Sequence, residues 1–107
     1  MLISAWTQTE FVSAIAFKVR SRQIEQSAAL DIIHIFEDIA AESFTVLLPS
    51  ANDYAQSQSY LTQFDTGLGA GDALHLAIAN THRATLATHD QLMFAAAAAL
   101  GIPTVAP

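Results

Sequence analysis

Short apolar runs of β-strand type alternate with helical patterns in the second half of the chain, and this alternation restricts the folds open to it. Three such runs occur, at Phe44–Leu48, Ala84–Thr88 and Ile102–Val105. A helix between two strands carries the chain back along a sheet, so that successive strands run parallel. The sequence therefore predicts an α/β fold with a mainly parallel sheet.

Helical patterns occupy most of the first half. Apolar residues at every third or fourth position predict one helix over Thr7–Arg20 and a second over Ile24–Ser43. The predicted apolar stripe of the second helix consists of Ile24, Ala28, Ile32, Phe36 and Ile39. Four aromatic residues are expected in a core or an interface: Trp6, Phe11, Phe17 and Phe36.

The second half contains three further predicted helices. Ser50–Asp53 provides capping residues for one that runs toward Asp65. Three of the four glycines lie within Asp65–Gly71, which predicts a loop. Asp72–His82 is apolar on more than one face and is expected deep in the fold, and the alanine-rich helix Gln91–Leu100 is expected to end at Gly101.

Length and composition narrow the class of protein. The 107 residues suffice for a single domain over 1–107 with its own core, and no linker or repeat divides them. Because cysteine is absent, disulfides, thiolate zinc sites and catalytic thiols are excluded, and a reducing cytoplasm is expected. No run approaches the ~18 apolar residues of a membrane helix, and no secretory signal is expected.

The charge balance bears on nucleic-acid binding. The formal net charge is −6, and the four basic side chains are Lys18, Arg20, Arg22 and Arg83. This balance argues against binding through a broad basic patch, but divalent cations can reverse the sign of an acidic cleft. The first three basic residues cluster at the end of the first predicted helix, where they complement the helix dipole or contact RNA phosphates.

Two carboxylates stand near predicted helix starts. Glu10 follows Thr7 at the spacing of a capping box, with Thr7 as the N-cap of the first helix. Asp72 opens an almost wholly apolar helix, where it complements the helix dipole or lies as a ligand at the rim of the core. His75, one turn later, is either a packed histidine or the second member of a metal pair.

A third carboxylate, Asp90, lies just beyond the predicted strand Ala84–Thr88. Ligands bind at this edge of open α/β sheets, and Asp is also a good N-cap for the following helix. Thr88 adds a hydroxyl group in the same turn. Carboxylates gathered at one edge would suit Mg²⁺ or Mn²⁺, ions that can activate water for attack on a phosphodiester.

Three segments, taken together and in this order, resemble the PIN-domain family, especially the VapC-like toxins of bacterial toxin–antitoxin modules: Ile3–Phe11, Leu68–Ala77 and Ala84–Pro103. The resemblance implies a PIN-like three-layer domain that is a Mg²⁺- or Mn²⁺-dependent endoribonuclease. It implies Glu10, Asp72 and Asp90 as metal ligands, with Thr88 supporting the site. It also implies RNA as substrate, a homodimer, and a cognate antitoxin that covers the acidic cleft.

One element of the family pattern has no counterpart here: a first, central strand that ends in an Asp. We therefore expect a domain incomplete at its N-terminus, with weak or absent ribonuclease activity. The strands on either side of the gap would leave backbone groups unpaired, at about 1–3 kcal/mol for each buried group, so an oligomer with an apolar interface is expected. Two alternatives are a non-catalytic PIN-like module for dimerisation or antitoxin binding, and an unrelated α/β domain whose acids are all helix caps.

Overall fold

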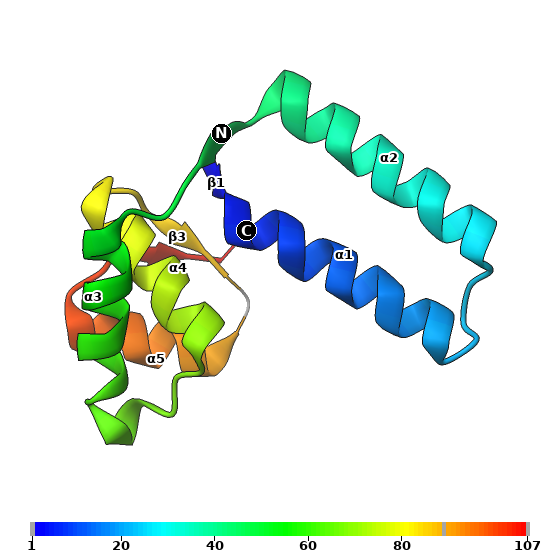
Figure 1. The fold of residues 1–107 in the computed structure, drawn as a ribbon. Helices are drawn as coiled ribbons and strands as arrows, with labels where there is room; N and C mark the ends of the chain where they lie inside the picture. The colour runs from blue at the N-terminus through cyan, green and yellow to red at the C-terminus, as the bar shows by residue number, and fades with distance from the viewer. Residues whose placement is uncertain (1, 89, 107) are drawn as a thin grey trace. The chain divides into compact units, whose positions relative to one another are not determined.

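The computed structural model describes residues 2–88 and 90–106, which form two compact units divided after Leu48 (Figure 1). The strand pairs in these ranges are all parallel, which confirms the predicted α/β fold with parallel strands. The elements follow in the order β1 (Leu2–Ser4), α1 (Ala5–Arg20), α2 (Gln26–Ser43), β2 (Thr45–Leu47), α3 (Ala51–Leu61), the 3₁₀ turn η1 (Phe64–Thr66), α4 (Ala70–Thr81), β3 (Leu86–Ala87), α5 (Gln91–Leu100) and β4 (Thr104–Val105).

The first unit is a helical hairpin closed by a two-stranded sheet. α1 and α2 lie side by side, and β1 pairs with β2 with Ile3 opposite Val46 (Figure 1). Phe11 of α1 stacks on Phe36 of α2, with ring centroids 4.1 Å apart and an angle of 18° between the rings. Three further apolar side chains of the hairpin are buried, namely Ile15, Ala29 and Ala40.

The start of α1 differs from the prediction. Ser4 is the N-cap, and its Oγ accepts a hydrogen bond from the backbone N–H of Thr7 at 3.2 Å. Nothing between Ser4 and Thr7 disfavours a helix, so the helix begins at the earlier capping residue, directly behind β1. The predicted N-cap at Thr7 is wrong, and with it the capping-box interpretation of Glu10, which lies in the second turn of α1.

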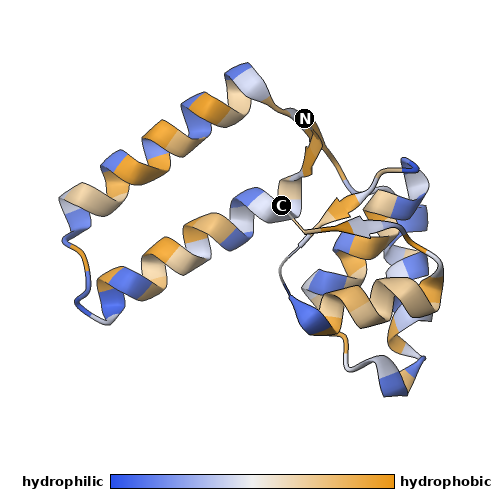
Figure 2. Ribbon diagram, turned by 180° about the vertical axis from the view of Figure 1, so that it is seen from behind, coloured by the Kyte–Doolittle hydropathy of each residue, from blue (hydrophilic) through white to orange (hydrophobic). Residues whose placement is uncertain are grey.

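Apolar residues recur along the whole length of α2 (Figure 2), and they fall on two adjacent faces of the helix. The face against α1 is buried or half-buried and consists of Ala29, Ile33, Phe36 and Ala40. The other face, called here the α2 seam, is exposed and consists of Ala28, Ile32, Ile35 and Ile39. The predicted stripe mixed the two faces, because spacing alone does not reveal which apolar face a neighbouring helix covers.

The second unit is built around α4 and α5. α3 packs against α4, and β3 pairs with β4 with Leu86 opposite Thr104. The core cluster consists of Leu76, Ala79, Met93, Ala96, Ala97 and Ile102. α4 has buried residues on several faces, as predicted from its composition, and α5 ends at Gly101 in the left-handed conformation (φ 74°).

A buried carboxylate joins α3 to α4. Ser50 and Asp53 form the capping box of α3, and Asp53 Oδ2 accepts a hydrogen bond from the Ser50 backbone N–H at 2.9 Å. Thr81 at the end of α4 donates its hydroxyl to Asp53 Oδ1 at 2.6 Å, and Asp53 is only 1% exposed. Burial raises the pKa of Asp53, but the hydrogen bonds from Ser50 and Thr81, with His82 nearby, outweigh it and hold the pKa below its ordinary value.

In the part of the chain that the structure describes, none of the helices is long and apolar enough to cross a lipid bilayer.

Candidate functional site

Asp90 and Thr88 occupy one turn at the carboxyl end of β3. Asp90 is the N-cap of α5, and its Oδ1 accepts hydrogen bonds from the backbone N–H groups of Leu92 at 2.8 Å and Met93 at 3.2 Å. Thr88 Oγ1 accepts a hydrogen bond from the Asp90 backbone N–H at 3.0 Å. The capping interpretation of Asp90 is confirmed. Because both capping bonds end on Oδ1, a ligand role for Oδ2 is compatible with the cap. His89, part of the same family-like segment, lies outside the described residues.

Asp72 lies in the first turn of α4. Gly69 is the N-cap of this helix and makes no side-chain capping bond, and negative charge in the first turn of a helix is favoured by the partial positive charge of its N-terminus. Asp72 is half-buried, whereas Ala73 and Leu74 beside it are buried. Asp72 therefore lies at the rim of the core, as expected from its position at the head of an apolar helix. His75 is half-buried one turn later on the same helix.

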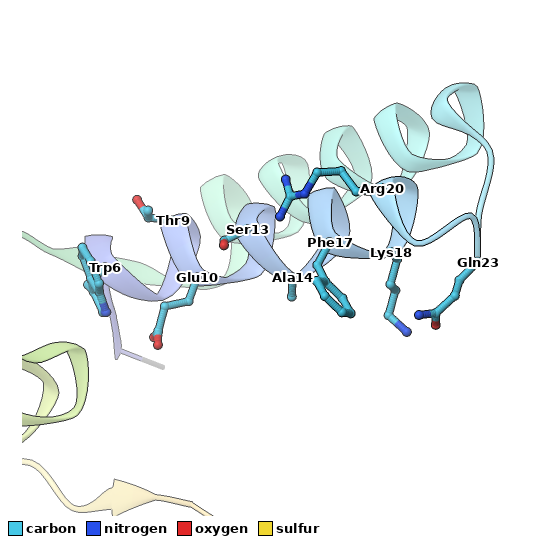
Figure 3. A pocket seen from close by; sticks show the side chains of 9 residues that line it. All are labelled: Trp6, Thr9, Glu10, Ser13, Ala14, Phe17, Lys18, Arg20 and Gln23. Atoms are coloured by element: carbon cyan, nitrogen blue, oxygen red, sulfur yellow. The ribbon is translucent and has the colours of Figure 1, made fainter. Parts of the chain in front are cut away.

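Glu10 lies on the exposed surface of α1 in the first unit. It lines a shallow pocket of about 550 Å³ along one side of the helix (Figure 3). The lining also includes Trp6, Thr9, Ser13, Ala14, Phe17, Lys18, Arg20 and Gln23. Trp6 and Phe17 are 37% and 58% exposed, so of the two expected places, a core or an interface, these rings do not occupy a core within this unit. Their spacing could have shown this, because it places them opposite Phe11 and Ile15 on the helix.

The three predicted metal ligands are distributed over both units. Asp72 and Asp90 each stand at the start of a helix in the second unit, and Glu10 stands in the first. Carboxylate oxygens are the ligands that Mg²⁺ and Mn²⁺ prefer. Within residues 2–88 and 90–106, no group of three or more His, Asp or Glu side chains is gathered closely enough to hold a metal ion. The donor atoms thus suit such an ion, while their joint coordination of one stays a prediction.

The family relationship rests on a match over almost the whole chain. The family model described as PIN domain matches residues 1–100. The chain belongs to the PIN domain family. The matched range includes Glu10, Asp72, Thr88 and Asp90, and it confirms the resemblance inferred from the three acidic segments. A search of curated proteins found no match.

A solved structure supports the same fold. The chain is similar to the crystal structure of FitAcB from Neisseria gonorrhoeae, with a TM-score of 0.62 and 23% sequence identity. The similarity covers 94% of this chain and 70% of that one. At this level of identity, the likeness shows the PIN-like fold alone.

Proposed function

We propose that this PIN-domain chain is a Mg²⁺- or Mn²⁺-dependent endoribonuclease and serves as the toxin of a toxin–antitoxin pair in the cytoplasm. The observation that carries the proposal is the setting of Asp72 and Asp90, each at a helix start in the second unit, in a member of this family. Hard divalent ions bind carboxylate oxygens, and such ligands are positioned precisely when they stand on rigid helices.

The proposed site consists of three ligands and the groups that position them. Glu10, Asp72 and Asp90 would hold the ion, which when bound supplies an activated water molecule and stabilises charge on the phosphodiester. The backbone N–H groups of Leu92 and Met93 fix the orientation of Asp90 through Oδ1. Thr88 positions the same turn by accepting the Asp90 backbone N–H. The N-terminus of α4 favours the negative charge of Asp72.

The proposed protein partners are an antitoxin and a second copy of the chain. The α2 seam offers a protein partner an apolar surface, because Ile32, Ile35 and Ile39 are 38%, 58% and 46% exposed along one side of the helix. Such a contiguous apolar stripe on a helix is typical of an interaction surface.

RNA cleavage with and without metal tests the proposed function. Because the family pattern includes a further Asp that has no counterpart in these 107 residues, we expect slow cleavage of single-stranded RNA in Mn²⁺ or Mg²⁺. EDTA should abolish it, and the product strands should carry terminal phosphates when analysed by mass spectrometry. Cleavage that proceeds equally in EDTA, or no cleavage in either metal, would contradict the proposal.

A non-catalytic PIN module for dimerisation or antitoxin binding is the second candidate. It is favoured by the exposed α2 seam, which offers an apolar surface to a protein partner. Calorimetry separates the two functions. Failure to bind Mn²⁺, together with retained binding of a protein partner, would support the module.

A further inference from the structure

One face of α1 combines aromatic, basic and acidic side chains that the hairpin does not use. Trp6, Glu10 and Phe17 follow one another at helical spacing, and their side chains extend from the same side of α1 (Figure 3). Phe11 and Ile15 occupy the opposite side, where Phe11 stacks on α2. Trp6 and Phe17 are 37% and 58% exposed, so part of each ring is open to a ligand.

The basic side chains of the first unit gather on this helix. Lys18 and Arg20 lie in the last turn of α1 and line the same pocket as Trp6 and Phe17. α2 has no Lys or Arg and carries four acids, Asp31, Glu37, Asp38 and Glu42. In a chain of net charge −6, positive charge in this unit is thus confined to the end of α1 and the turn after it. Charge of this sign is complementary to a phosphate backbone.

The pocket extends along α1 for the length of more than one nucleotide. Its volume of about 550 Å³ is that of a small-molecule site. Trp6 and Phe17 are eleven residues apart, which corresponds to roughly 16 Å along a helix axis. Two bases of one strand could each contact a ring, while phosphates of the same strand contact Lys18 and Arg20, which line the same pocket. Polar side chains between the rings, such as Ser13, distinguish this face from the wholly apolar α2 seam.

We propose that this face of α1 binds single-stranded RNA. Trp6 and Phe17 stack on bases, and Lys18 and Arg20 contact phosphates. Interleaved aromatic and basic side chains are the general means by which proteins hold unpaired strands, because every base has a flat face to stack. The inference rests on the proposed ribonuclease function and adds the residues that would bring the substrate to Glu10.

Binding without cleavage tests this proposal in the intact chain. In EDTA, the fluorescence of Trp6, the sole tryptophan, is followed while single-stranded RNA or the same sequence as a duplex is added. Saturable quenching by the single strand is expected, with much weaker quenching by the duplex, whose bases are already stacked. Phe17→Ala and Phe17→Leu should each weaken binding about tenfold, because both remove an aromatic stacking surface.

Matched substitutions outside the pocket serve as controls. Phe64→Ala, at a phenylalanine that is 87% exposed in the second unit, should change the affinity by less than about twofold.

The salt dependence of binding tests the basic side chains of the pocket. Lys18→Ala with Arg20→Ala should lower the slope of log affinity against log salt by about 1.4, which corresponds to two single-strand phosphate contacts. Arg83→Ala should leave that slope unchanged. Circular dichroism verifies that each variant is folded.

The possible outcomes separate this proposal from the proposed function. Unchanged Trp6 fluorescence at saturation, equal affinities of Phe17→Ala and Phe64→Ala, or equal binding of duplex would overturn the α1 site. Quenching only by a peptide or protein partner would overturn it as well. Binding at this face by a chain that never cleaves RNA in Mn²⁺ would support the α1 site and contradict the ribonuclease.

Discussion

Asp72→Asn is expected to reduce Mn²⁺-dependent cleavage of RNA by at least about 100-fold, because the neutral amide removes a charged oxygen ligand from the proposed ion. Asp72 stands in the first turn of α4, beside the buried residues Ala73 and Leu74, so its position is set by a helix anchored in the core. Asn has nearly the same shape as Asp, and the variant should fold. Initial rates on labelled single-stranded RNA measure the effect.

Asp65→Asn is the matched control for this result. Asp65 is an exposed acid in η1, just before the loop that leads to α4, and it loses the same charge. Its cleavage rate should stay within about twofold of the parent rate. Equal rates for Asp72→Asn and Asp65→Asn would remove Asp72 from the proposed site.

Asp53→Asn is expected to lower the free energy of unfolding by about 2 kcal/mol. Asp53 is buried and accepts hydrogen bonds from the Ser50 backbone and the Thr81 hydroxyl on its two oxygens. An amide has one oxygen, so one of these donors would face an NH₂ group instead of an acceptor. Thermal unfolding should show a fall in Tm of roughly 10 °C.

The effect of Asp53→Asn should also depend on pH. Because the pKa of Asp53 is lower in the folded chain than in the unfolded chain, its carboxylate contributes its full stability above the unfolded pKa. That contribution is lost as the pH falls through the folded pKa. The difference in free energy of unfolding between parent and variant should therefore be largest near neutral pH and shrink in acid. A difference that does not change with pH would contradict the lowered pKa of Asp53. A Tm equal to that of Asp65→Asn would show that the buried hydrogen bonds contribute little.

The fold was predictable where local rules decide it. Alternating strand and helix patterns predicted parallel strands, and the capping roles of Ser50 and Gly101 followed from residue type. Residue type left Asp90 open between an N-cap and a ligand, and the structure shows the cap. The start of α1 was missed because Ser4 and Thr7 are both good caps and nothing in the sequence ranks them. The exposed face of α2 was missed because burial depends on where a neighbouring helix packs.

For the candidate site, too, local features were predictable from the sequence and long-range contacts were not. The positions of Asp72 in the first turn of α4 and of Asp90 just before α5 were predictable, because the sequence indicates where each helix starts. The hydrogen bond from Thr81 to Asp53 was not predictable, because it joins residues 28 positions apart through the packing of α3 on α4. Convergence of carboxylates on an ion is a long-range property of the same kind, and helix periodicity carries no information about it.

Selective broadening of NMR signals by Mn²⁺ tests most directly whether Glu10, Asp72 and Asp90 hold one ion. Bound Mn²⁺ broadens the backbone amide signals of nearby residues in the folded chain. At substoichiometric Mn²⁺, the signals around all three acids should broaden together, recover with excess Mg²⁺, and stay sharp in Asp72→Asn. Broadening confined to the acidic side of α2, near Asp31 and Asp38, or sharp signals around Glu10 while those near Asp72 disappear, would contradict a shared metal site.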